Sequence, residues 1–155
     1  MNAVTEKIED LLSGLKITYR KFEHEPVTTS EDAARIRDKD ISTGAKALIF
    51  IADGEPILVV VPGDKRFNTK KFKLDFKIKD LYMADAEKLK EVTGLIKGAV
   101  PPIGKIFGIK TYFDQSFTNK DTVAFNAGSL TISIEMAAAD LITAADPIIA
   151  DITND

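Results

Sequence analysis

One lysine of the sequence is placed where an ammonium group could do chemistry. Lys46 stands at the start of an apolar segment, residues 44–50. From there it could point into a cleft and hold a phosphate or carbonyl oxygen. A lysine beside such a segment also commonly lies along its edge with its charge in water. Both interpretations stay open from the residues alone.

A second candidate is the loop over residues 98–104, which combines glycine with two adjacent prolines. Gly98 lets a ligand approach its N–H closely, while Pro101 and Pro102 fix the backbone and remove two donors. Such a loop can present amide groups to an oxygen atom, or it can be a rigid surface connection. If it forms one wall of a site, we expect Gly98→Val to block that site with little loss of stability.

Most other catalytic arrangements are excluded by composition. The 155 residues include no Cys and one His, His24, so disulfides, thiolate metal sites and a cysteine nucleophile are ruled out. His24 lies at the predicted end of a strand, which favours a structural role. No phosphate-binding loop, nucleophile elbow or dinucleotide-binding glycine pattern occurs. An enzyme with this sequence would therefore use backbone amides, a lysine and substrate groups, with no metal and no cofactor.

Charge is unevenly distributed along the chain. The formal net charge is -3, yet residues 64–79 hold seven basic residues against two acidic ones. A basic segment on an acidic body is typical of a surface that docks phosphates. The alternative is a solvated helix face. The residues in question include Lys65, Arg66, Lys70 and Lys71.

The N-terminus is charged and mixed, unlike a signal or transit peptide. No apolar run reaches the ~20 residues of a membrane-spanning helix. These two observations predict a cytoplasmic protein without membrane contact.

The hydrophobic pattern predicts one domain over residues 1–155, of the α+β class. We expect a mixed, curved sheet with helices inserted between its strands. The helices are predicted over 4–15, 30–37, 68–74, 84–92 and 137–144, and the strands over 16–22, 45–51, 56–61, 80–83, 109–113, 122–125 and 130–134. The second helix could start with a capping box, formed either by Thr28 with Glu31 or by Thr29 with Asp32.

Five short motifs occur together in order. They are residues 24–34, 44–46, 60–66, the Gly-x-x-x-Pro loop over 98–102, and residues 126–129 before a strand that ends near Glu135. This set resembles the YbaK/ProX family of aminoacyl-tRNA deacylases, which are similar to the editing domain of some bacterial prolyl-tRNA synthetases. The resemblance spans roughly residues 3–145.

The resemblance implies a fold, a site and a reaction. The implied fold is a mixed sheet, curved like a partial barrel and surrounded by helices. Lys46 matches the lysine that helps to bind the tRNA 3′ end, and Gly98 matches the glycine whose N–H belongs to the reaction centre. Family members generally hydrolyse the ester with help from the terminal adenosine hydroxyl or from the substrate's own side chain. The residues that we expect around the substrate are Phe22, Thr28, Pro101, Pro102, Asn126, Gly128 and Ser133.

The expected activity is therefore editing of mischarged tRNA that carries a small amino acid, of the Ala, Ser, Thr or Cys class. Phe22 and Ser133 stand where the branch that acts on cysteinyl-tRNA has Tyr and Asp, so alanyl-, seryl- and threonyl-tRNA are equal candidates. Lys65, Arg66, Lys70 and Lys71 are expected to contact the acceptor end, and an aminoacyl-tRNA synthetase is a possible partner. The alternative is a non-catalytic module of the same fold that binds tRNA or a synthetase.

Overall fold

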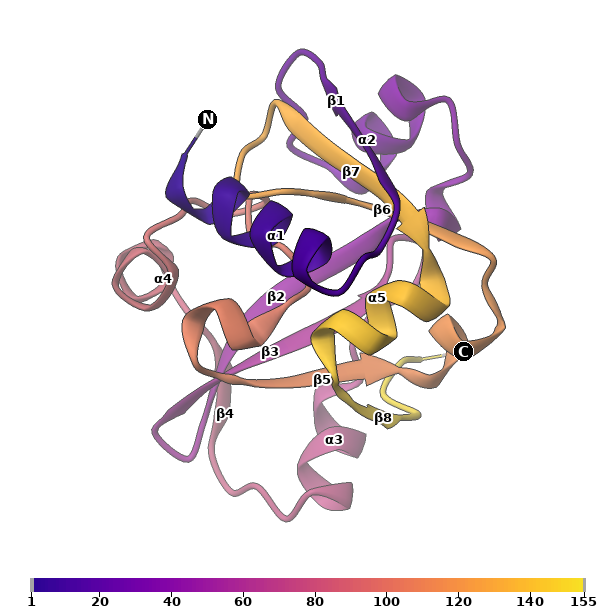
Figure 1. Cartoon of the computed structure of the whole chain (residues 1–155). Helices are drawn as coiled ribbons and strands as arrows, with labels where there is room; N and C mark the ends of the chain where they lie inside the picture. Colours follow the sequence, from indigo (N-terminus) through magenta and orange to yellow (C-terminus); the bar gives the residue numbers. More distant parts are fainter. Residues whose placement is uncertain (1, 155) are drawn as a thin grey trace.

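A computed structural model describes residues 2–154 of the chain (Figure 1). Its strands form two sheets, and helices pack around them. No helix among the described residues is long and apolar enough to cross a membrane.

The larger sheet contains five strands in the order β4-β2-β3-β5-β8. Strands β2 and β3 form an antiparallel hairpin, whose turn residues Asp53 and Gly54 both have positive φ, as a type I′ turn requires. Strand β4 pairs antiparallel with β2, whereas β5 is parallel to both β3 and β8. The strands span Ala45–Ala52 (β2), Glu55–Pro62 (β3), Leu81–Met83 (β4), Lys110–Asp114 (β5) and Ile148–Ala150 (β8).

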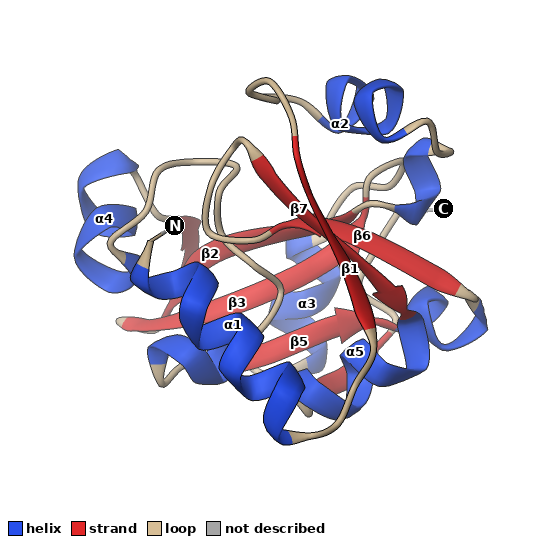
Figure 2. Cartoon of the chain, turned by 45° about the horizontal axis from the view of Figure 1, so that its top comes forward, coloured by secondary structure: helices blue, strands red, loops and turns tan. Residues whose placement is uncertain are grey.

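The smaller sheet has the order β1-β7-β6 and is antiparallel throughout. Its strands are β1 (Tyr19–Glu23), β6 (Thr122–Asn126) and β7 (Ile132–Ala137). A parallel bridge between Gly44 and Ala124 joins it to the start of β2, and Figure 2 shows its strands running across those of the larger sheet. The two sheets together form a mixed, curved and unclosed surface, which confirms the predicted fold class.

Strand β3 is buried on both faces, as its continuous apolar sequence predicts. Leu58 and Val60 pack into one core with helices on that face, while Val59 and Val61 pack into a second core on the other. The first core includes side chains of α1 (Ala3–Gly14), α4 (Ala86–Thr93) and α5 (Ala138–Ala145), and the second is covered by α3 (Thr69–Asp75). The sheet is therefore the middle layer of the molecule.

Helix α2 (Ser30–Arg37) lies at the periphery, beyond the ends of β1 and β7 (Figure 2). Thr29 is its N-cap, and the Thr29 hydroxyl accepts a hydrogen bond from the Asp32 N–H at 3.0 Å. Of the two predicted capping arrangements, the structure thus has the one based on Thr29. The helix positions its first and last residues beside the start of β2, which matters for the site below.

All the predicted helices and strands are present, with ends shifted by a few residues. Strand β8 was not predicted, because three residues after Pro147 carry no periodicity and pair only where the fold brings them beside β5. Three 3-10 helices were also missed, at Ile41–Thr43, Gly104–Phe107 and Gln115–Asn119. The second of them begins at the last residue of the loop over 98–104.

A buried carboxylate ties the end of β5 to the C-terminal segment. The Asp114 oxygens accept hydrogen bonds from the N–H of Ile152 at 3.1 Å, the N–H of Ser116 at 3.2 Å and the hydroxyl of Thr153 at 3.3 Å. Burial raises the pKa of Asp114, but a hydrogen bond from the Ser116 hydroxyl and the three bonds above lower it by more, so its pKa lies below the ordinary value. The ionised form is therefore the one that the fold stabilises.

We expect Asp114→Asn to lower the free energy of unfolding at pH 7 by about 2–3 kcal/mol, because an amide cannot accept all of these bonds. A depressed pKa stabilises the fold above the unfolded value of about 3.9 and stops doing so as the pH falls through the folded value. The difference in the free energy of unfolding between the wild-type protein and Asp114→Asn should therefore become smaller as the pH is lowered. Urea unfolding at several pH values measures it, and a pH-independent difference would contradict this account.

Candidate active site

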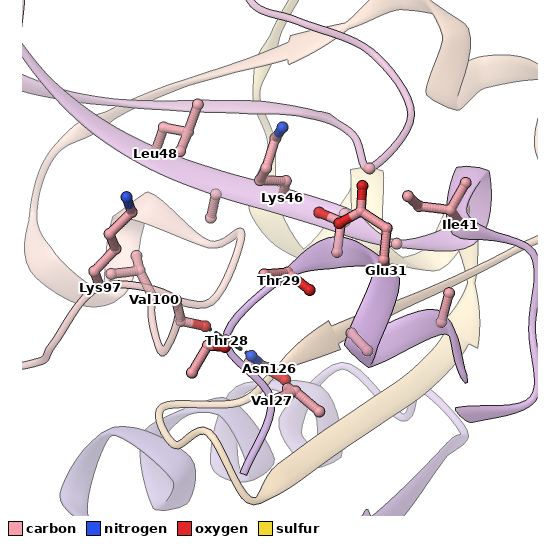
Figure 3. Close-up of a pocket in the computed structure, with 18 of the residues that line it drawn as sticks. Val27, Thr28, Thr29, Glu31, Ile41, Lys46, Leu48, Lys97, Val100 and Asn126 are labelled. Atoms are coloured by element: carbon pink, nitrogen blue, oxygen red, sulfur yellow. Dashed lines mark hydrogen bonds between the residues drawn. The ribbon is translucent and has the colours of Figure 1, made fainter. Parts of the chain in front are cut away.

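A cavity of about 410 Å³ lies between α2, the start of β2 and the loop that contains Gly98 (Figure 3). Its volume is in the range of pockets that bind small ligands. Both residues predicted to carry the chemistry, Lys46 and Gly98, line it. The fold thus brings together two positions that are 52 residues apart in the sequence.

Lys46 is half-buried at the second position of β2, and its Nζ lies 3.5 Å from the carbonyl oxygen of Lys65. Burial lowers the pKa of Lys46, and so does nearby Arg66, whereas the carboxylates of Glu31 and Asp64 raise it. The net result is a pKa below the ordinary lysine value. No ion pair of Lys46 occurs among the described residues, so its charge is available to a ligand.

Gly98 is the third residue of a tight turn over residues 96–99. The turn is closed by a hydrogen bond from the Ala99 N–H to the Ile96 carbonyl at 3.1 Å. Gly98 has a φ of 88° and Lys97 has no positive φ, which is the pattern of a type II turn. Within residues 2–154, the Gly98 N–H makes no hydrogen bond. A free donor therefore stands at the cavity wall.

Two hydrogen bonds fix this turn against strand β6 and the residues after it. The Asn126 Nδ2 donates to the Gly98 carbonyl oxygen at 2.7 Å, and the Gly128 N–H donates to the Ala99 carbonyl oxygen at 2.9 Å. The carbonyls of the last two residues of the turn are thus held by the same segment. The cavity wall keeps its shape without a ligand.

Arg37, at the end of α2, also lines the cavity and was not predicted from the sequence. Its Nε donates to the Ser133 Oγ at 3.1 Å and its Nη2 donates to the Asn126 Oδ1 at 3.0 Å. Burial lowers the pKa of Arg37 to about 10, an effect that the charge of Glu135 partly offsets. In the sequence this arginine resembles any charged residue near a helix end, and only its side-chain contacts distinguish it.

Of the residues expected around the substrate, Thr28 and Asn126 line the cavity as Lys46 and Gly98 do. Five others lie elsewhere and do not line it: Phe22, Pro101, Pro102, Gly128 and Ser133. Both prolines are buried in the core behind the loop, and Val100 takes the wall position instead. An added Cβ at Gly128 would meet Val4 of helix α1.

Phe22 and Ser133 are neighbours across β1 and β7, outside the cavity. Ser133 is fully buried, and its Oγ is also 2.7 Å from the His24 Nε2. The His24 Nδ1 lies 2.8 Å from the Glu25 carbonyl, which can only accept, so that nitrogen carries the proton. His24 is thus a structural residue that orients Ser133, in line with its predicted role.

The structure changes the physical reason for expecting Gly98→Val to block the site. An added Cβ at Gly98 would come within 3.2 Å of the Leu130 Cδ2, so it would not project into the cavity. At a φ of 88° any L-residue is strained by ~1–2 kcal/mol. The substitution would therefore disturb the turn and its N–H direction, at a cost in stability, rather than fill the site.

The predicted tRNA-contact residues divide into two groups. Lys65 and Arg66 lie beside Lys46. The Lys46 Nζ is 3.5 Å from the Lys65 carbonyl oxygen, and the charge of Arg66 lowers the Lys46 pKa. Lys70 and Lys71 lie on α3, over the second core. The Lys71 Nζ forms ion pairs with Asp75 at 3.2 Å and with Asp151 at 3.5 Å, so it is engaged within the protein.

Lys97, Glu31 and Asp40 complete the charged lining and were also missed, because each lies in a segment where an exposed charge is ordinary. Figure 3 shows Lys97 and Glu31. Within the described part of the chain, no three His, Asp or Glu side chains are grouped so as to hold a metal ion. The chemistry available from the lining side chains and backbone is that of cations, carboxylates, a free amide N–H and hydroxyl groups.

Comparison with known proteins identifies relatives. Residues 24–144, well over half of the chain, match the aminoacyl-tRNA editing domain. The chain is 28% identical over 147 residues to the multifunctional Ser/Thr-tRNA deacylase ProXp-y of Escherichia coli, covering 92% of this chain and 88% of that protein. It is 30% identical over 112 residues to the proline–tRNA ligase of Lactobacillus helveticus, covering 72% of this chain and 20% of the ligase. The chain thus spans about a fifth of that longer relative.

Solved structures show the same fold. The crystal structure of hypothetical protein APE2540 superposes with a TM-score of 0.86 at 27% identity, over 96% of this chain and 99% of that one. A proposed trans-editing enzyme for prolyl tRNA synthetase superposes with a TM-score of 0.85 at 19% identity, over 100% and 99% of the two chains. These matches confirm the resemblance that the sequence motifs indicated.

Glu31→Gln should lower the pKa of Lys46 further, because it removes a carboxylate that favours the charged ammonium. Nuclear magnetic resonance titration of the Lys46 Cε–Hε signals measures this. Glu87→Gln, on the exposed first turn of α4, is the matched control and should leave Lys46 unaffected. An unchanged Lys46 titration in Glu31→Gln would mean that Glu31 does not set the charge of the cavity.

Proposed function

Because the chain belongs to the aminoacyl-tRNA editing domain family, a family of enzymes, we propose that it hydrolyses the ester between tRNA and a wrongly attached small amino acid. The observation that carries the proposal is the meeting of Lys46 and the free Gly98 N–H at one cavity. A fixed cation and a fixed donor are what an ester hydrolase needs as charge develops on the carbonyl oxygen.

In the proposed reaction, Lys46 holds a phosphate or hydroxyl oxygen of the tRNA 3′ end. The Gly98 N–H donates to the ester carbonyl oxygen, which becomes negative when water attacks the carbonyl carbon. A single well-placed amide donor of this kind is worth about 10²–10³ in rate. The products are the free amino acid and the tRNA with its terminal hydroxyl restored.

The protein offers few groups to activate the water. The Asp40 carboxylate lines the cavity but accepts from the backbone N–H of Ser42, which lowers its pKa and makes it a weak base. Glu31 is the other carboxylate of the lining, and it adjoins Lys46. The scarcity of bases supports assistance by a hydroxyl of the terminal adenosine or by the substrate's own side chain.

The wall residues support a small substrate. Several of them are alanines, which line the cavity without adding polar groups, and a hydrogen bond from Asn126 anchors the turn of Gly98. A rigid wall excludes a larger side chain by clash, whereas one missing methylene changes binding by only about 1–3 kcal/mol. Alanine, serine, threonine and cysteine all fit this description. The relative named as a Ser/Thr-tRNA deacylase supports the middle two.

The second candidate is a non-catalytic module that binds tRNA or a synthetase. The match to part of a proline–tRNA ligase favours a synthetase as its partner. The presence of both Lys46 and Gly98 argues for the enzyme, since a binding module has no need of a free donor beside a cation. Either role would place the protein with the translation machinery of the cytoplasm.

Lys46→Ala should reduce deacylation of the best substrate by at least ~100-fold while the protein remains folded, because the site loses its fixed cation. The measurement is release of amino acid from a panel of alanyl-, seryl-, threonyl- and cysteinyl-tRNA. Lys7→Ala, on the exposed face of α1, is the matched control. Near-normal rates for Lys46→Ala would exclude the proposed role, and a wild-type protein inactive on the whole panel would favour the binding module.

The basic residues beside the cavity should dominate tRNA affinity. Reversing Lys65 and Arg66 to Glu should weaken binding and flatten its dependence on salt, because fewer counterions are released. Lys70→Glu, on α3, should have a smaller effect. Filter binding at several salt concentrations measures both slopes. If Lys70→Glu weakened tRNA binding as much as the reversal of Lys65 and Arg66, tRNA would not bind preferentially beside Lys46.

A further inference from the structure

Arg37 is a half-buried cation with no carboxylate partner. Its guanidinium forms no ion pair within residues 2–154, and the charge of Glu135 acts on it only at longer range. A buried charge without a partner is costly, so the contacts that it does make must matter. Those contacts are the hydrogen bonds to Ser133 at 3.1 Å and to Asn126 at 3.0 Å.

Arg37 determines which way the Asn126 amide faces. A guanidinium can only donate, so the Asn126 atom that faces it must be the oxygen. The other end of the amide is then the Nδ2, which donates to the Gly98 carbonyl at 2.7 Å. Were the amide reversed, its oxygen would face the Gly98 carbonyl oxygen, and two acceptors would repel each other.

The Ser133 hydroxyl completes the arrangement from the other side. Its Oγ accepts from the Arg37 Nε, so its own proton is directed to the His24 Nε2 at 2.7 Å or to the Asn126 oxygen at 3.4 Å. The guanidinium is thus held at two atoms, which prevents it from rotating. A rigid donor in turn keeps Asn126 in one orientation.

The turn at Gly98 needs such an external hold. In a type I turn the middle peptide is rotated by about half a turn relative to a type II turn, and the N–H of the third residue then points the opposite way. The Asn126 bond holds the next peptide, at the Gly98 carbonyl, and so restrains the Gly98 backbone, whose φ of 88° the observed form requires. Figure 3 shows Asn126 beside the loop that carries Lys97 and Val100.

We propose that Arg37 is a positioning residue for the deacylation reaction, which acts through Asn126 to hold the Gly98 turn with its N–H toward the ester. This inference rests on the proposed function, because it assigns a role to the Gly98 N–H. Arg37 itself does not touch the reacting atoms in this account. Its loss should therefore lower kcat much more than it changes KM.

The test compares variants along this chain of contacts. Arg37→Met should lower kcat by about 10–100-fold, since small displacements of a reacting group have effects of this order. Arg37→Lys, which keeps one donor, should recover part of the loss. Arg35→Met is the matched control, because Arg35 lies on the same helix with its side chain exposed. A kcat of Arg37→Met equal to that of the control would overturn the proposal.

Two Asn126 variants separate positioning from a merely structural role. Asn126→Asp still accepts from Arg37 but cannot donate to the Gly98 carbonyl, so it should lower kcat as much as Arg37→Met does. The double variant Arg37→Met with Asn126→Ala should be no slower than the slower single variant. If the double variant lost the product of the two single losses in kcat, Arg37 and Asn126 would act independently. Full activity of Asn126→Asp would show that the contact with the Gly98 carbonyl is dispensable. Both results would contradict the proposal.

A readout independent of activity distinguishes failure of this inference from failure of the proposed function. The amide chemical shift and hydrogen exchange of Gly98 should change alike in Arg37→Met and Asn126→Ala, and not in Arg35→Met. If the wild-type protein deacylated no tRNA, these signals would still decide whether Arg37 holds the turn. An unaltered Gly98 signal in a folded Arg37→Met would refute it. If that variant failed to fold, Arg37→Lys and Asn126→Asp would supply the same comparison.

Discussion

The side chain of Asn126 makes the hydrogen bonds on which the candidate site depends. It stands at the end of β6, accepts from Arg37 of α2 and donates to the carbonyl of Gly98. Three segments that are far apart in the sequence meet at this one amide. Because a half-satisfied amide inside a protein is costly, the three segments are coupled, and each restricts the position of the others. The cavity is the space that they enclose with the start of β2.

The larger sheet supplies the fixed side of the cavity. Strand β3 is buried on both faces, and β2 is paired along its whole length, so Lys46 projects from a backbone that cannot shift. Its ammonium is partly removed from water, while Glu31 counteracts the effect of burial on its pKa. A rigid cation facing a rigid turn suits a reaction in which the protein stabilises charge and the substrate supplies part of the chemistry. That division of roles is the core of the proposed function.

The sequence was sufficient to predict the fold class, and its motifs pointed to Lys46 and Gly98, which both line the cavity, because these depend on local patterns. It did not reveal Arg37, since a charged residue near a helix end has the same pattern whether it is exposed or turned inward. It assigned Pro101 and Pro102 to the wall, although both are buried away from the cavity and Val100 lines it instead. Contacts between distant segments, such as β8 with β5 or Arg37 with Asn126, need the tertiary arrangement before they can be recognised.

The most direct test of the account is binding of a non-hydrolysable analogue, an adenosine whose 3′ oxygen is replaced by an amide link to serine or alanine. Isotope-edited nuclear magnetic resonance would follow the backbone amides during titration. The account predicts that the Gly98 amide shifts strongly at saturation and that Lys46→Ala weakens binding while other amides behave as in the wild-type protein. Saturable binding that leaves Gly98 unmoved and is indifferent to Lys46→Ala would contradict the claim that this cavity is the site of editing.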